Sequence, residues 1–245
     1  MGRGGRLPEE TTDMIRGFKL SYNTVAIVNI ATGICRSDDD ECDIVLAAAD
    51  SASLAVSGAG GLDTGVEASS TWYYVWVILN PVTQAVDTLL STSSTAPTLP
   101  AGFTKKRRIG VIRNDGSSNI RPFIQRGKGN DRMYGYVQLF SVLSNGAADT
   151  WTSVSCAAYI PPTNTAVIVE LTGKADGEDG QTSEVRIVSS LPGNSAQLLA
   201  FGNKNDKNST NTEKLATDGS QSLEYQGATG DSLVDIGILG FDEEL

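Results

Sequence analysis

One string in the sequence is typical of an enzyme, Leu62-Asp63-Thr64-Gly65. Asp-Thr-Gly is the core of the aspartic proteases, in which two carboxylates share a proton and activate a water molecule. The string occurs once, so such a site would require a dimer, and glycine-rich residues precede it where those proteases have an apolar strand. We therefore interpret it as a turn, which the Asp63 side chain closes and in which Gly65 takes a positive φ angle.

A basic stretch runs from Lys105 to Arg132, where nine basic side chains accompany only two acidic ones. Few aromatic residues are interleaved for base stacking, which argues against nucleic acid as a partner. Because the rest of the chain is acidic, we expect this stretch to meet an acidic surface of a neighbouring subunit. The residues assigned to this assembly interface are Lys105, Lys106, Arg107, Arg108, Arg113, Arg121 and Arg126.

Cysteines and carboxylates suggest two further sites. Cys35 and Cys42 flank a polar segment short enough to be a hairpin tip. A disulfide or a shared metal ion stays open there, but two free thiols are favoured because metal sites need more ligands. The acidic residues 173–180 offer the oxygen ligands of Ca²⁺ without the spacing of an EF-hand, and we interpret them as a solvated hairpin tip. We expect no metal site and no cofactor.

The composition excludes several common mechanisms. The 245 residues include no His, which removes the Ser-His-Asp and Cys-His nucleophile systems and His-ligated zinc. The net charge of −10 disfavours a polyanion as the main ligand. Three Cys, an odd number, suit a chain that folds in a reducing compartment. The longest apolar run, residues 72–79, is far shorter than the about 20 residues of a membrane helix. We therefore expect a protein that is neither an enzyme nor a membrane protein.

Glycine outnumbers proline 26 to 8 and Ser and Thr are abundant, which predicts strands joined by tight turns. Residues 72–79 are apolar or aromatic at every position, so we expect a central strand covered on both faces. Two hairpins are predicted before residue 127, and seven short strands follow it. The first hairpin joins 24–30 to 43–48, the second joins 108–113 to 119–125, and the later strands are 134–142, 151–159, 166–171, 183–188, 198–201, 222–225 and 233–241.

These elements predict an all-β protein with β-sandwich or jelly-roll-like domains. Residues 1–20 have no hydrophobic period and are expected to form a flexible N-terminal arm. A change of composition near residue 127 separates a first β domain, 21–127, from a C-terminal β-sandwich domain, 128–245.

The order of several motifs resembles that of virion structural proteins of tailed bacteriophages, of the tail-fibre or head-fibre kind. The motifs are residues 61–65, the aromatic strand from Thr71 to Val75, the Ser-, Thr- and Pro-rich segment that leads through Lys105 to Gly110, and Arg113-Asn114-Asp115-Gly116. The second half is similar, more loosely, to β-sandwich modules of phage fibres. The points of similarity there are residues 151–156, 160–162 and 234–241.

The resemblance implies a non-enzymatic capsid or tail component that is commonly a homo-oligomer, with trimers frequent. Because the chain is short and has no heptads, we expect a head fibre, decoration protein, fibre base or tail adaptor rather than a fibre shaft. Its partners would be other virion subunits, and it would be made in the host cytoplasm. The alternative is a receptor- or carbohydrate-binding module at a fibre tip, in which Trp151 or Tyr159 stacks on the sugar rings of a host-surface glycan.

Overall fold

The computed structural model describes residues 12–175, 181–187, 199–203, 209–216, 221–227 and 232–245. All regular secondary structure in these ranges is β-strand, and the sheets are largely antiparallel, which confirms the all-β, sandwich-like class. No helix long and apolar enough to span a membrane occurs among these residues. The chain separates into two compact units. The first comprises the chain up to Arg121, Gln125–Arg132 and Leu245, and the second comprises Pro122–Ile124 and Met133–Glu244.

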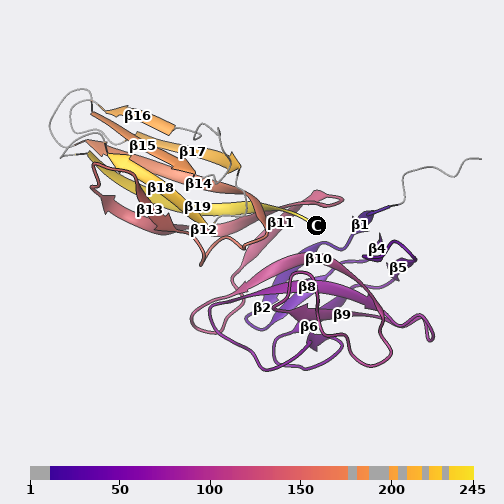
Figure 1. The fold of residues 1–245 in the computed structure, drawn as a ribbon. Helices are drawn as coiled ribbons and strands as arrows, with labels where there is room; N and C mark the ends of the chain where they lie inside the picture. Colours follow the sequence, from indigo (N-terminus) through magenta and orange to yellow (C-terminus); the bar gives the residue numbers. More distant parts are fainter. Residues whose placement is uncertain (1–11, 176–180, 188–198, 204–208, 217–220, 228–231) are drawn as a thin grey trace, which may run out of the picture. The chain divides into compact units, whose positions relative to one another are not determined.

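The first unit is organised around strand β8 (Thr71–Leu79), which lies between β10 (Lys105–Asn114) and β9 (Val86–Ser91), as Figure 1 shows. A short strand, β7 (Gly61–Leu62), runs parallel to β9 at the edge. Every residue from Tyr73 to Leu79 is buried. The predicted central strand is therefore confirmed, and its burial on both faces explains why its sequence lacks the alternation of a half-exposed strand.

The large aromatic residues of β8 find partners for their polar atoms in nearby loops. Trp76 is 1% exposed, and its indole Nε1 donates a hydrogen bond to the carbonyl of Ser93 at 3.3 Å. The hydroxyl of Tyr73 accepts one from the backbone N–H of Ala68 at 2.8 Å. Buried Trp and Tyr need such partners, so these contacts tie the flanking loops to the central strand.

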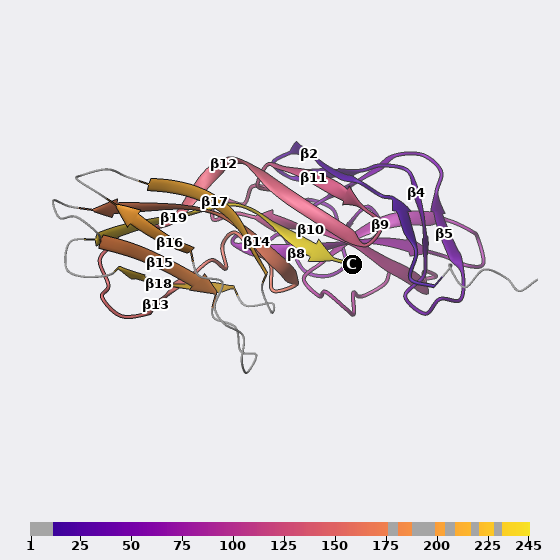
Figure 2. The ribbon, with the colours of Figure 1, turned by 90° about the horizontal axis from the view of Figure 1, so that it is seen from above.

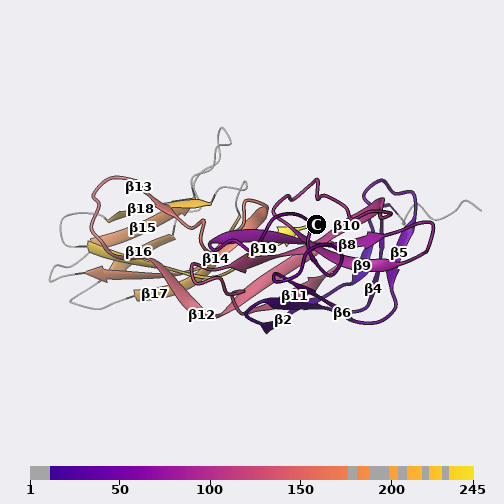
Figure 3. The ribbon, with the colours of Figure 1, turned by 90° about the horizontal axis from the view of Figure 1, so that it is seen from below.

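The first predicted hairpin is wrong in its pairing. The polar segment 37–42 is a hairpin tip, but it joins β5 to β4, whereas β3 pairs with β2 and β6. Strand β4 lies nearer in sequence to the tip than residues 24–30 do, so the connection from β4 to β5 is the shorter one. Figure 3 shows β4 beside β5. The bounds are β2 (Leu20–Thr24), β3 (Ile27–Ile30), β4 (Gly33–Arg36), β5 (Asp43–Leu46) and β6 (Asp50–Ser53).

The first strand lies within the segment predicted to be an arm. Residues 1–11 of the predicted arm lie outside the described residues, but β1 (Ile15–Gly17) pairs with β4. Ile15, Phe18 and Leu20 are almost completely buried. These three buried side chains anchor the segment in the first unit, so the expected arm does not extend to residue 20.

The second predicted hairpin is also different. Residues 108–113 lie in β10, whose ladder partner is β8. After the turn at Asp115, the chain returns through a bridge between Asn114 and Ile120 and through backbone hydrogen bonds from Asp115 N to Asn119 O and from Arg121 N to Arg113 O. Pro122 follows and lacks the N–H that would continue the pairing. Strand β11 (Phe123–Lys128) then starts anew.

The second unit is a sandwich of two four-stranded layers, which Figure 2 shows edge-on. One layer has the order β17-β14-β19-β12 and the other has β13-β18-β15-β16. Val167, Val169, Ile236 and Ile238 of the first layer are buried. The bounds are β12 (Asp131–Gly146), β13 (Thr152–Ser155), β14 (Asn164–Ala175), β15 (Gln181–Ile187), β16 (Leu199–Asn203), β17 (Ser209–Ala216), β18 (Ser222–Gly227) and β19 (Ser232–Glu244).

The central position of β8 leads to a stability prediction with a matched control. Val77→Ala removes two methyl groups from a fully buried site and should lower the free energy of unfolding by about 2 kcal/mol. Val82→Ala makes the same change where the side chain is 89% exposed and should leave stability nearly unchanged. Urea unfolding followed by tryptophan fluorescence measures both. Equal effects of the two substitutions would contradict the central placement of β8.

Candidate interaction surfaces

The first cations of the basic stretch are ion-paired within the chain. Lys105 at the start of β10 contacts the carboxylates of Asp39, at 2.6 Å, and Glu41, and Lys106 contacts Asp38. The backbone N–H of Asp38 also donates to the carbonyl of Lys106 at 2.9 Å. The acidic tip between β4 and β5 and the basic start of β10 therefore form one ion-pair network, defined here as the tip network.

The tip network changes the protonation of its members. The hydrogen bond from Lys105 lowers the pKa of Asp39 from 3.8 to about 2, and the hydroxyl of Ser37, which donates at 2.6 Å, assists it. The same contacts with Asp39 and Glu41 raise the pKa of Lys105. Both carboxylates keep substantial solvent exposure, so water and salt weaken each pair.

Arg107 is almost completely buried. Its guanidinium contacts the carboxylate of Asp13 and donates to the backbone carbonyl of Leu245 at 3.2 Å. A buried cation must be paired, and this one holds the two ends of the described chain against β10. With Lys105 and Lys106 it was assigned to an interface with another subunit. Their acidic partners are instead supplied by the same chain.

Cations of β10 also stack on the aromatic rings of β8. Lys106 lies 4.9 Å from the ring centroid of Trp76, Arg108 lies 5.7 Å from Tyr74, and Arg113 lies 5.2 Å from Trp72. Such cation–π contacts contribute about 0.5–1 kcal/mol each at exposed sites. They explain why basic residues occupy a strand beside the aromatic one.

Two members of the assigned interface remain. Arg121 is half-buried after β10, and Arg126 is exposed on β11. The seven assigned residues therefore do not form one uncompensated cationic patch. A role in assembly stays a prediction for them.

Asp63-Thr64-Gly65 is a turn, as the sequence predicts. Asp63 accepts hydrogen bonds from the backbone N–H groups of Thr64 at 2.7 Å and of Thr98 at 2.9 Å, and Gly65 has a φ of 75°. The Asp63 carboxylate therefore connects this turn to the backbone of the loop that contains Thr98.

All three cysteines are free thiols. Cys35 and Cys156 are buried, and burial raises the pKa of each to about 12, so neither supplies a thiolate near neutral pH. Cys42 is partly exposed at the end of the hairpin tip. Among the described residues, no group of three or more Cys, Asp or Glu is arranged to hold a metal ion. Residues 176–180 of the second acidic segment lie outside the described ones.

The aromatic residues assigned to glycan contact lie at the two ends of β13. Trp151 precedes the strand and is half-buried. The ring of Tyr159 stacks on Phe140, with centroids 4.9 Å apart, and its carbonyl accepts a hydrogen bond from the hydroxyl of Tyr136. Tyr159 therefore takes part in internal packing. Sugar binding at these residues stays a prediction.

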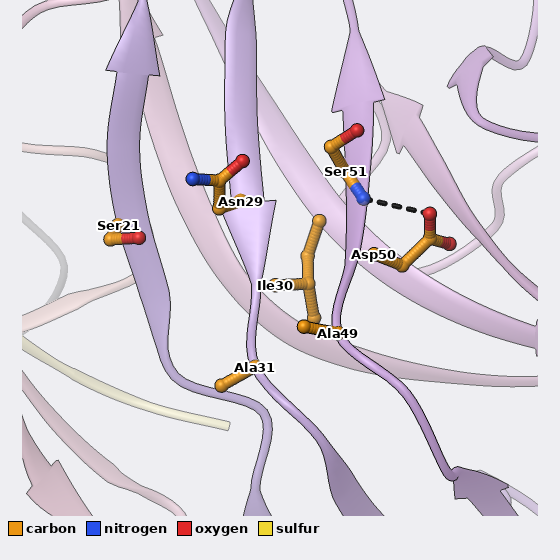
Figure 4. Close-up of a pocket in the computed structure, with 7 residues that line it drawn as sticks. All are labelled: Ser21, Asn29, Ile30, Ala31, Ala49, Asp50 and Ser51. Atoms are coloured by element: carbon orange, nitrogen blue, oxygen red, sulfur yellow. Dashed lines mark hydrogen bonds between the residues drawn. The ribbon is translucent and has the colours of Figure 1, made fainter.

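An open hollow of about 550 Å³ lies on the β2–β3–β6 sheet of the first unit. Figure 4 shows Ser21, Asn29 and Ser51 on three neighbouring strands, with the backbone N–H of Ser51 bonded to the carboxylate of Asp50 at 2.8 Å. The side chains that line it include no aromatic ring. It therefore lacks the flat apolar platform on which sugars stack.

Comparisons with known proteins do not place the chain in a family. No family model and no curated protein matches it. Three solved structures resemble it weakly. A crystal structure of CapF with the inhibitor 3-isopropenyl-tropolone has 10% identity over 61% of this chain and 34% of that one, with a TM-score of 0.17. SGBP-B from a complex xyloglucan utilization locus in Bacteroides uniformis has 9% identity over 95% and 73%, with a TM-score of 0.14. The T=1 particles derived from infectious bursal virus have 8% identity over 98% and 80%, with a TM-score of 0.12. TM-scores this low give no basis for assigning a function.

The pKa of Asp39 predicts how acid affects the tip network. Because folding lowers this pKa from 3.8 to about 2, the stabilisation is fully present above pH 3.8 and is lost as the pH falls through about 2. The Asp39→Asn variant should therefore lose less unfolding free energy than the parent protein between pH 5 and pH 2.5, measured by urea unfolding at each pH. Asp131→Asn, which alters an exposed carboxylate of the same unit, is the control. A parent-like pH profile for Asp39→Asn would contradict the network.

Proposed function

We propose that the protein is a non-enzymatic structural component of a tailed phage particle, such as a head fibre, decoration protein, fibre base or tail adaptor, that acts through protein–protein assembly. The order of motifs in its first half supports this, as does its all-β build from two units. Its partners are other virion subunits and further copies of the same chain, with a trimer favoured by the resemblance.

An exposed apolar strip in the second unit is the observation that carries the proposal. Val137 and Leu139 on β12 are 61% and 42% exposed, and Ile124 on β11 is 51% exposed. These three residues define the apolar strip. Aliphatic side chains gathered at a protein surface are typical of a contact with another protein.

Side-chain alternation explains why the strip faces outwards. Tyr134, Tyr136 and Phe140 make ring contacts on one face of β12, and Tyr134 stacks on Phe241 with centroids 4.7 Å apart. Val137 and Leu139 are separated from these residues by odd numbers of positions, so they point to the opposite face.

The neighbouring strands bring further apolar groups to this opposite face. A Cβ atom at Gly237 of β19 would meet the Cδ1 atom of Leu139 at 2.4 Å, so Leu139 lies directly over that glycine. Phe123 contacts the ring of Tyr134, with centroids 5.6 Å apart, which directs the next residue, Ile124, to the face of the strip. Exposed apolar side chains on adjoining strands suit close packing against a partner.

The tip network bears on which kind of interaction would drive such assembly. Because Lys105, Lys106 and Arg107 already have acidic partners in the chain, burial of apolar surface is expected to drive association rather than attraction of opposite charges.

The apolar strip predicts a salt-insensitive oligomer. Light scattering should give a multiple of 25.8 kDa at both 50 and roughly 500 mM salt, since screening acts on charges and not on apolar burial. The double variant Val137→Asp and Leu139→Asp should shift the mass to the monomer. Val66→Asp adds one negative charge at a valine outside the strip that is 84% exposed and should leave the oligomer intact. A monomeric parent protein, or dissociation by Val66→Asp, would contradict the role of the strip.

Presence in the particle tests the proposed function directly. An antibody against the purified protein should detect it in density-purified phage particles from the host that carries the gene, at a copy number of several or more per particle. A host cytosolic enzyme followed in the same fractions is the control for contamination. If the protein stays in the lysate and is absent from the particles, the proposal is wrong, whatever its oligomeric state.

A further inference from the structure

Strand β1 is a short edge strand that lies beside a buried thiol. It has three residues, and it forms one edge of the three-stranded sheet β1-β4-β5. Ile15 of β1 lies directly opposite Cys35 of β4 in the antiparallel ladder, so the two side chains are neighbours on one face of the sheet. Cys35 is a free thiol and is completely buried. Strand β1 therefore covers one flank of this thiol.

A cation that is paired with the segment before β1 also acts on Cys35. Burial raises the pKa of the Cys35 thiol to about 12, and the positive charge of Arg107 opposes this rise. The guanidinium of Arg107 in turn contacts the carboxylate of Asp13, two residues before β1. Removal of residues 13–17 would therefore take away both the side chain beside the thiol and the carboxylate that neutralises the nearby cation. We call residues 13–17 the strap.

Polar contacts attach both ends of the strap. The carboxylate of Asp13 contacts Arg107 and accepts a hydrogen bond from the side-chain amide of Asn130 at 2.9 Å. At the other end, Nη2 of Arg132 donates to the carbonyl of Gly17 at 3.0 Å. Polar contacts of this kind can be exchanged for contacts with water when a segment opens.

Apolar burial adds little to this attachment. Of residues 12–17, Ile15 alone is buried, while Met14 is half-buried and the other four are exposed. Segments that bury few apolar side chains open at a lower free energy than the core does. Opening of the strap exposes one buried side chain, whereas unfolding of the first unit exposes the whole of β8.

A strained hinge joins the strap to β2. Gly17 has a φ of 79° and Phe18 one of 51°, a region that bulky side chains rarely adopt. Phe18 is completely buried, its N–H donates to the carbonyl of Thr32 at 3.1 Å, and its ring lies directly over Gly33, where a Cβ atom would meet it at 2.5 Å. These contacts fix Phe18 and leave the exposed Gly17 as the pivot. Backbone strain at such a junction persists only while the surrounding contacts impose it.

We propose that the strap opens at Gly17 without unfolding of the first unit and thereby admits small thiol-reactive molecules to Cys35. Opening removes Ile15 from the flank of the thiol and separates Asp13 from Arg107. A guanidinium without its carboxylate favours a thiolate nearby, and the thiolate is the reactive form. The strap therefore controls both access to the thiol and its reactivity. The proposal concerns the first unit alone and does not depend on the proposed function.

Labelling of the native full-length protein with iodoacetamide, followed by peptide mass spectrometry, tests the proposal. In this reaction the thiolate sulfur displaces iodide from carbon, and the thiol proton passes to the buffer. Cys42 is partly exposed and reports that the reagent is active. We expect Cys35 to be labelled in the native protein although it is completely buried.

Two variants release the strap in different ways. Asp13→Ala removes its contact with Arg107, and Gly17→Ala places a Cβ atom 2.3 Å from the carbonyl oxygen of Thr32. Each should speed the labelling of Cys35 at least tenfold, because each disfavours the closed strap. Neither should change the labelling of Cys156, which is completely buried in the second unit and whose pKa is likewise raised to about 12.

Val77→Ala is the control that separates local opening from global unfolding. It weakens the buried strand β8 but touches no contact that the opening strap breaks, so the labelling rate of Cys35 should stay at that of the parent protein. If Val77→Ala speeds this labelling as much as the strap variants do, Cys35 reacts through global unfolding and the proposal is overturned. It is equally overturned if Cys35 stays unlabelled when Cys42 has reacted completely, or if both strap variants label Cys35 at the parent rate.

Discussion

The first unit depends on the burial of strand β8 on both faces. A strand whose residues from Tyr73 to Leu79 are all apolar or aromatic cannot face water on either side. Its edges pair with β9 and β10, and β5 and β6 pack against the sheet that they form. The loops that receive the polar atoms of Tyr73 and Trp76 are held by the same strand. Both the tip network and the stacked cations of β10 therefore follow from where β8 lies.

The cations of the first unit fall into two groups with different consequences. Those at the start of β10 meet carboxylates of the same chain, so their charge holds a hairpin tip in place. Arg16, Lys19 and Lys128, in contrast, are exposed and form no ion pair with another residue in the described part of the chain. The paired cations stabilise the fold, and the exposed ones stay in contact with water. A basic stretch in a sequence does not distinguish these cases.

Strand predictions succeeded where apolar or β-branched residues were dense, as in 72–79, 166–171 and 233–241. Several strands were missed, and two of them, β17 and β9, illustrate the reasons. Strand β17 is mostly polar because it lies at a sheet edge, where few side chains need burial. Strand β9 follows a Pro-containing turn inside a segment rich in Ser and Thr, which masked its short buried run. The apolar strip had a readable signal, because Val137 and Leu139 alternate with aromatic residues in one strand.

Composition and period-two patterns indicated the all-β class and the central strand, because side-chain alternation and strand propensity act between neighbours in sequence. Only the tertiary structure decided which strands pair and which residues form ion pairs. Lys105 and Lys106 meet acids more than sixty residues away, and Arg107 meets both Asp13 and Leu245. The sequence around a lysine or arginine does not determine which distant carboxylate it contacts. The choice follows from which strands the burial of β8 brings together.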